Sequence, residues 1–150
     1  FSVKDENSDQ TTAKRIDFAA LRTGANGQNE IVFYEAKHYS NSELFAQTGE
    51  PKVVGQIRVY EQEYIEKMQA EIISAYSQYF DDFQKITGTS LGTAPVAVNP
   101  NVRLVIFGFD QDQKEGSNFN RRINKLKKYL EGEYILLKGD AKDFRSGISN

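Results

Sequence analysis

Several residue types that build common active sites are missing or rare in this chain of 150 residues. It contains no cysteine, no tryptophan, one methionine and a single histidine, His38. Without cysteine, the chain cannot form disulfides, cysteine-ligated zinc sites, iron–sulfur clusters or a catalytic thiolate. A lone histidine argues against a Ser-His-Asp triad and against a His-rich metal site. Any catalysis would therefore depend on carboxylates, lysine, arginine, tyrosine or an amide.

Long apolar stretches are also missing. Crossing a bilayer takes about 20 consecutive apolar residues, and the apolar runs in this chain are only a handful of residues long. No N-x-S/T site and no signal-like start is present. We therefore expect no membrane partner and a reducing, cytoplasmic setting.

Length and composition fit one globular domain over residues 1–150. The hydrophobic fraction is 39% and the charged fraction is 27%, and a chain of this size buries enough surface for a core of its own. Because the chain begins at Phe1 rather than at methionine, we expect it to be a domain of a longer protein. Residues 1–13 are polar without periodicity, which predicts an irregular or incomplete N-terminal segment.

Charge is spread unevenly along the chain, although the net charge is only −2. Residues 1–113 carry 10 basic and 16 acidic side chains, whereas residues 114–130 carry six basic side chains and one acidic side chain. Within this basic segment, apolar residues recur at helical spacing, and four basic residues lie on another side of the same helix: Arg121, Arg122, Lys125 and Lys128. Such a face is either a solvated surface or a surface that contacts the phosphates of a nucleic acid.

Hydrophobic patterning predicts four strands. Apolar and polar residues alternate over 15–21 and 31–37, and the intervening residues 23–29 are typical of a hairpin loop. A nearly continuous apolar run over 102–109 predicts a central strand that is covered on both faces. Residues 134–137 predict a last strand.

Two helices are predicted between these strands. Apolar residues recur every three or four positions from Lys52 to about Gly88, which predicts one long amphipathic helix, straight or bent. A second helix follows over 119–130, with Ser117 or Asn118 as its N-cap and Gly132 as its stop. The order strand–strand–helix–strand–helix–strand predicts an α/β fold with a mixed sheet flanked by helices.

Acidic and basic residues meet at the end of the second strand, in Glu35-Ala36-Lys37. The pattern acid-x-Lys occurs four times in the chain, against about 1.7 times expected by chance, so the pattern alone carries little weight. Only Glu35 and Lys37, however, end an apolar strand, where the period of two aims both side chains at one face. If the hairpin turns about Asn26, Asp17 stands opposite Glu35, about 5 Å away at Cβ.

Two opposed carboxylates repel each other unless a cation lies between them. Mg²⁺ is a hard ion that binds one or two carboxylates, water and phosphate oxygens. Beside such an ion, Lys37 would position the attacking water or stabilise the pentavalent phosphorus. In the alternative interpretation, Asp17 and Glu35 each pair separately with Arg15, Lys37 or Arg58 on a wet sheet face.

These residues resemble the site of the PD-(D/E)XK, or restriction-endonuclease-like, nuclease superfamily. Asp17, Glu35-Ala36-Lys37 and a following helix with Gln56 and Tyr60 occur in the superfamily's order, and the Q-x-x-x-Y spacing is similar to that of RecB-type nucleases. The resemblance covers about residues 14–109. It implies a restriction-endonuclease-like core in which Asp17, Glu35 and the carbonyl of Ala36 bind Mg²⁺ or Mn²⁺. Lys37 would be the catalytic lysine.

The resemblance also implies that Gln56 and Tyr60 support the site or the DNA strand. A core tyrosine is the alternative for Tyr60, which falls on the apolar stripe of its helix. The chain departs from the superfamily in two ways. Ile16 stands where many members have proline, and residues 1–13 show no counterpart of the superfamily's first helix and first strand.

The first functional hypothesis is a Mg²⁺-dependent nuclease that hydrolyses DNA phosphodiester bonds, as the effector domain of a restriction or phage-defence protein. RNA is an alternative substrate, and a homodimer or an assembly with a sensor or ATPase partner is expected. The second hypothesis is a catalytically inactive nucleic-acid-binding or interaction module with the same fold. A small-molecule enzyme has little support, because no glycine-rich phosphate loop is present.

Overall fold

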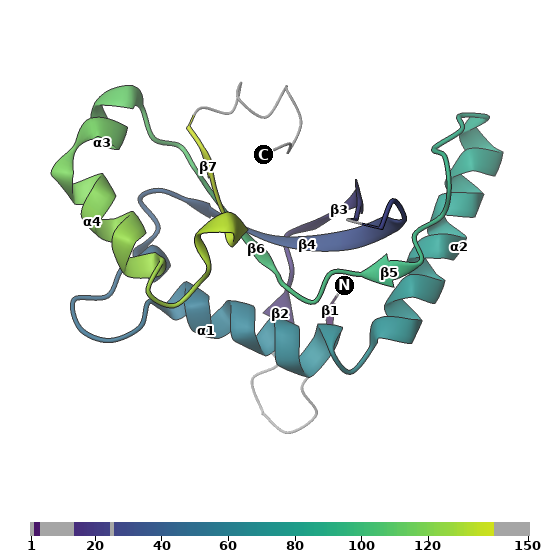
Figure 1. Ribbon diagram of the computed structural model, residues 1–150, viewed down its shortest axis with the longest axis horizontal. Coiled ribbons are helices and arrows are strands. Elements are labelled where there is room, and N and C mark those ends of the chain that lie inside the picture. Colours follow the sequence, from purple (N-terminus) through teal and green to yellow (C-terminus); the bar gives the residue numbers. More distant parts are fainter. Residues whose placement is uncertain (1, 4–13, 25, 140–150) are drawn as a thin grey trace.

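The computed structural model describes residues 2–3, 14–24 and 26–139 (Figure 1). The strands are β1 (Ser2–Val3), β2 (Lys14–Arg15), β3 (Phe18–Thr23), β4 (Asn29–His38), β5 (Ala97–Val98), β6 (Arg103–Phe107) and β7 (Ile135–Lys138). The helices are α1 (Lys52–Val59), α2 (Gln69–Thr87), α3 (Gln111–Glu115) and α4 (Ser117–Leu126), with short helical turns η1 (Ser42–Leu44), η2 (Tyr60–Ile65) and η3 (Gly132–Tyr134). The predicted element order is present, with several short additions.

The main sheet is mixed, as the sequence predicts. Its strand order is β3-β4-β6-β7, and β5 also pairs with β4. Strands β3 and β4 are antiparallel, whereas β4 pairs parallel with β6 and β6 parallel with β7. The two parallel connections run through helices because a parallel crossover needs a long segment to return to the starting edge. The α/β class and the mixed sheet are therefore confirmed.

The hairpin has the predicted register but begins later than predicted. Phe18 faces Tyr34 and Thr23 faces Asn29, which is the register of a turn about Asn26. The ladder stops at Phe18, so Asp17 lies outside β3 rather than within a strand that starts at Arg15. Before it, β2 pairs with β1 in a separate small sheet. The expectation of an irregular start is thus wrong for Ser2–Val3, whereas residues 1 and 4–13 lie outside the described residues.

The predicted long helix is interrupted. After α1, the chain makes the π-helical turn η2, and Met68 leaves helical geometry with φ −121° and ψ 25° before α2 begins. Figure 1 shows α2 running in a different direction from α1. Helix α2 ends at Gly88, whose φ of 66° is a left-handed conformation that glycine adopts without steric cost. The predicted end of this helical region is therefore confirmed.

The start of the second helical region differs from the prediction. A separate short helix, α3, precedes α4, and Asp110 caps it through a capping box with Gln113. The N-cap of α4 is Gly116, without a side-chain hydrogen bond, so Ser117 and Asn118 are not caps. The reason is local: the reciprocal bonds of Asp110 and Gln113 satisfy two backbone N–H groups at the earlier position. Helix α4 ends at Leu126, and Gly132 lies in η3 instead of stopping the helix.

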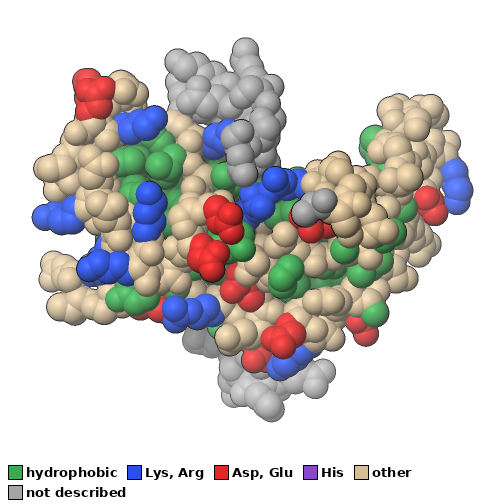
Figure 2. Space-filling view, viewed as in Figure 1, with side chains coloured by type: hydrophobic (Ala, Val, Ile, Leu, Met, Phe, Trp, Pro, Cys, Tyr) green, Lys and Arg blue, Asp and Glu red, His purple; other side chains and the backbone are tan. Residues whose placement is uncertain are grey.

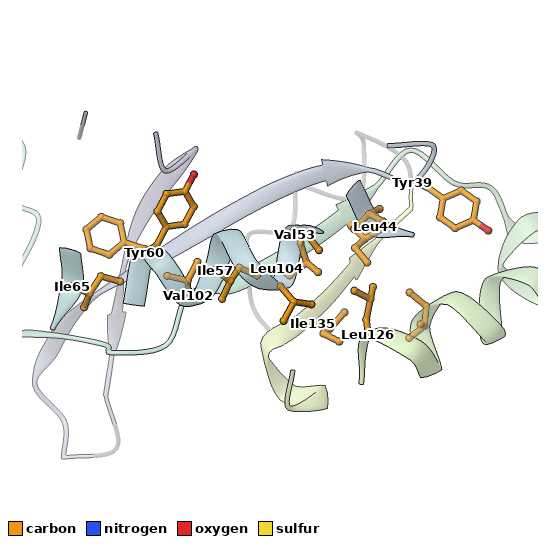
Figure 3. Close-up of a cluster of buried hydrophobic side chains, with 14 of the residues drawn as sticks. Tyr39, Leu44, Val53, Ile57, Tyr60, Ile65, Val102, Leu104, Leu126 and Ile135 are labelled. Carbon is orange, nitrogen blue, oxygen red and sulfur yellow. The ribbon is translucent and has the colours of Figure 1, made fainter. Parts of the chain in front are cut away.

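The main core lies between one face of the sheet and the helices. Figure 3 shows Val53 and Ile57 from α1 and Leu126 from α4 near Leu104 of β6. A smaller cluster of strand residues on the opposite face contains Val32, Tyr34, Val105 and Leu136. Strand β6 contributes to both clusters, which confirms a central strand buried on both faces. Within the described ranges, no helix is long and apolar enough to cross a membrane.

Glu61 links η2 to the start of the central strand and makes stability depend on pH. Its Oε1 accepts a hydrogen bond of 2.9 Å from the N–H of Val102. Burial raises the pKa of Glu61 above its ordinary 4.5, although the Val102 N–H and the charge of Arg58 oppose the shift. Folding therefore favours the protonated carboxyl, and this contribution to stability is lost as pH rises from 4.5 through the raised pKa.

We expect Glu61→Gln to become more stable relative to the parent between pH 4.5 and pH 7. The glutamine keeps an acceptor oxygen for Val102 but has no charge to desolvate. Urea unfolding at several pH values measures the difference. A stability difference that stays constant across this range would contradict the assignment of a raised pKa to Glu61.

Candidate active site

Glu35 and Lys37 lie at the end of β4 on the face that the helices cover. Ile31 and Phe33 of the same strand belong to the main core, and the period of two continues that face to Glu35 and Lys37. Glu35 is only 3% exposed. The buried apolar part of β4 is thus followed directly by the charged pair, and the pairing of the sheet fixes the positions of both residues.

Lys37 is shared between two carboxylates. Its Nζ lies 2.7 Å from Oε1 of Glu35 and 2.6 Å from Oε2 of Glu43. Glu43 belongs to η1, whose N-cap Asn41 accepts a hydrogen bond of 2.8 Å from the Glu43 N–H. Sequence reasoning missed Glu43. The available signal was an asparagine cap followed by an acidic residue in the turn directly after the charged strand end.

Asp17 contacts the strand between Glu35 and Lys37. Its Oδ2 accepts a hydrogen bond of 2.8 Å from the N–H of Ala36. The side chain thereby takes the place of a backbone acceptor where the β3–β4 ladder has ended. In a strand, the N–H and C=O of one residue point to the same edge, so the Ala36 carbonyl also faces the edge that Asp17 occupies. The structure thus brings together Asp17, Glu35, Ala36 and Lys37.

The electrostatics of the pair are set by burial and by two acidic neighbours, Asp17 and Glu43. Burial raises the pKa of Glu35, the hydrogen bond from Lys37 opposes the shift, and the charges of Asp17 and Glu43 add to it. For Lys37, burial alone would lower the pKa, but the bonds to Glu35 and Glu43 outweigh burial and raise it. Lys37 therefore remains an ammonium at neutral pH, with an excess of acidic groups around it.

The donor set fits a hard divalent cation. Oε2 of Glu35 is buried and has no hydrogen-bond partner among the described residues. Within the same ranges, no three His, Cys, Asp or Glu side chains form a metal-binding group by themselves. Mg²⁺ is commonly held by one or two carboxylates with water completing its shell. Asp17, Glu35 and the Ala36 carbonyl match that requirement.

Separate ion pairs, the alternative considered from the sequence, describe part of this arrangement. Glu35 does pair with Lys37, but Arg58 is exposed and pairs with Glu50 at 2.6 Å. Across the described residues, Asp17 makes no ion pair. Within the described part of the chain, Asp17 is therefore an acidic group without a cation partner beside the buried pair.

The turn after α1 brings Tyr60 to this region, whereas no described contact joins Gln56 of α1 to the charged pair. Tyr60 is buried, and its hydroxyl donates a hydrogen bond of 2.9 Å to the Arg15 carbonyl. Burial, with a contribution from the charge of Glu35, raises the pKa of Tyr60 to about 12. Tyr60 is thus a core residue whose pKa is also affected by the charged pair. Oε1 of Gln56 is buried and lacks a partner in the described part of the chain.

The four basic residues predicted on one helix face divide into two groups, and Lys128 lies beyond the end of α4. Arg122 lies over the ring of Phe45 at 3.7 Å, and Lys125 donates hydrogen bonds to the carbonyls of Ala46 and Gln47. Arg121 and Lys128 are exposed, and Arg121 contacts only the neighbouring turn through Asn118 at 2.9 Å. Figure 2 shows basic side chains over α3 and α4. A cleft of 480 Å³ lies between α4 and residues 44–47.

Comparisons of the chain with protein-family models, with curated proteins and with solved structures found no match.

Lys37 is expected to stabilise the fold mainly by compensating the buried charge of Glu35. Lys37→Met should lower the free energy of unfolding by about 3 kcal/mol at pH 7.5, because it leaves a buried carboxylate without its counter-ion. The loss should be smaller at pH 5, because the pKa of Glu35 rises further in the variant and protonation removes the charge. Urea unfolding at both pH values measures the two losses.

The double variant Glu35→Gln with Lys37→Met is the matched control. It has no buried carboxylate, so its stability relative to Glu35→Gln should not change between pH 5 and pH 7.5. A loss in Lys37→Met that is equal at both pH values would show that packing of the lysine stem, rather than charge, carries its contribution.

Proposed function

We propose that this chain is a nuclease domain of the PD-(D/E)XK type that hydrolyses DNA phosphodiester bonds with Mg²⁺ or Mn²⁺. The observation that carries the proposal is the environment of Glu35. One carboxylate oxygen binds Lys37, and the other is buried without a partner among the described residues. Asp17 accepts a hydrogen bond from Ala36, the residue between Glu35 and Lys37. The mixed α/β sheet with a hairpin and a parallel third strand is compatible with the restriction-endonuclease-like core.

Asp17, Glu35 and the Ala36 carbonyl would hold the metal ion. When bound, such an ion lowers the pKa of a coordinated water and neutralises charge that develops on the phosphate. Lys37 keeps its proton in this setting and can stabilise an anionic phosphate oxygen or orient the water. Tyr60 holds the Arg15 carbonyl, two residues before Asp17, and so positions the chain that carries the first ligand.

The basic residues of α4, together with Lys128 just after it, supply a second surface suited to a polyanion. Arg121 and Lys128 are exposed and free to contact phosphates, whereas Arg122 and Lys125 also hold residues 45–47 against α4. We propose that this surface binds the backbone of DNA, with RNA as the alternative polyanion. As an effector domain of a restriction or phage-defence protein, the chain would obtain target recognition from a second copy or from a sensor or ATPase partner.

The metal ligands give the first functional test. Asp17→Asn and Glu35→Ala should each lower Mg²⁺- or Mn²⁺-dependent cleavage of DNA by several orders of magnitude while the protein stays folded. Glu50→Ala is the matched control, because it removes an acidic side chain whose partner, Arg58, is exposed. Cleavage is measured on plasmid and linear DNA with and without chelator.

Two outcomes would count against the proposal. Metal-dependent cleavage that survives in both ligand variants would place the active site elsewhere. A parent protein that binds DNA but never cleaves it, with either metal, would instead favour the second hypothesis, a binding module with the same fold.

The basic surface gives an independent test. Arg121→Gln with Lys128→Gln should weaken binding to all DNA sequences and reduce the slope of log affinity against log salt by about two units, since each phosphate contact contributes about 0.9. These two residues are chosen because substituting Arg122 or Lys125 would also release residues 45–47. Lys67→Gln with Lys85→Gln, which removes two other exposed lysines, should leave the slope unchanged. An unchanged slope in the first variant would make the α4 face an ordinary solvated surface.

A further inference from the structure

Lys37 binds one oxygen of Glu35, and a metal ion would bind the same carboxylate through the other oxygen. Its ammonium is 2.7 Å from Oε1 of Glu35, while Oε2 has no partner among the described residues. A divalent cation at Glu35 and the ammonium therefore compete for the same carboxylate, and the two positive charges repel each other. Metal binding therefore requires a second carboxylate that can pair with the Lys37 ammonium.

Glu43 provides this second carboxylate. Its Oε2 lies 2.6 Å from the Lys37 ammonium, and Glu43 belongs to the turn η1 rather than to the strand that carries Glu35. The turn that carries Glu43 is held at both sides, because Asn41 caps it and the next residue, Leu44, is 2% exposed. The Glu43 side chain itself is one-third exposed. Its carboxylate is thus positioned by the backbone and is not needed to fill the core.

We propose that Glu43 is a positioning residue that draws Lys37 away from Glu35 when a divalent cation binds, so that ammonium and metal can occupy the site together. This inference rests on the proposed function. Without Glu43, moving Lys37 off Glu35 would leave a largely buried ammonium without a counter-ion, which is strongly unfavourable. With Glu43, the ammonium keeps a charge-assisted hydrogen bond throughout.

The proposal predicts opposite effects of two substitutions on metal affinity. Glu43→Gln should weaken the binding of Mn²⁺ by about tenfold, the scale of a lost contact behind a metal ligand. Lys37→Met should strengthen Mn²⁺ binding, because it removes the competing cation. In the Lys37→Met background, Glu43→Gln should then change the affinity by no more than about twofold, because its effect acts through the lysine.

Isothermal titration of Mn²⁺ into the full chain at fixed pH and salt measures all four affinities. Glu50→Gln is the matched control for loss of one negative charge, and its affinity should equal that of the parent. Glu43→Asp keeps the carboxylate on a shorter stem and should recover part of the loss. Recovery by aspartate separates the charge of residue 43 from any effect on folding, which urea unfolding of each variant checks.

The outcomes separate this inference from the proposed function. If the parent binds Mn²⁺, and Asp17→Asn and Glu35→Gln abolish binding, an unchanged affinity in Glu43→Gln overturns the inference alone. An equal loss from Glu43→Gln in the parent and in the Lys37→Met background also overturns it, because Glu43 would then act directly on the metal. A parent that binds no Mn²⁺ overturns the proposed function and this inference together.

Discussion

Strand β4 carries the constraint on which the rest of the structure depends, because it must satisfy partners on both edges and bury side chains on both faces. It pairs with β3 on one edge and with β5 and β6 on the other. Its alternate residues enter the main core and the smaller cluster on the opposite face. Glu35 therefore becomes buried as a consequence of sheet pairing, and its charge then needs Lys37 beside it.

The connection between β4 and α1 joins the two surfaces that the proposed function uses. Near its start, Glu43 receives the ammonium of Lys37. A few residues later, Phe45 packs under Arg122, and the carbonyls of Ala46 and Gln47 accept hydrogen bonds from Lys125. Movement of this segment would therefore change the contacts of both the charged pair and the basic helix. A short surface segment between rigid elements is a common location for residues that bind and react.

Local patterning predicted the sheet, the hairpin and the end of α2 well, but it missed the break between α1 and α2 and both ends of the second helical region. The register of β3 and β4 follows from alternation and from the position of the turn, both of which are local. The break at Met68 and the capping box at Asp110 depend on how the chain turns to return to the sheet, so periodicity alone did not reveal them. Local patterning also could not choose between a core role and a site role for Tyr60. The residue is buried in the core, and it also lies close enough to Glu35 for the charge of Glu35 to raise its pKa.

The sequence by itself determined the order of elements, the mixed sheet and the placement of Glu35 and Lys37 on one face, because these follow from periods of two and of 3.6 residues. Only the tertiary structure decided which groups meet that pair. Asp17 bonds to the Ala36 N–H because β3 begins only at Phe18, and Glu43 reaches Lys37 because a capped turn follows β4. Contacts of this kind depend on where strands stop and how connections turn, which is governed by packing between distant segments rather than by any local pattern.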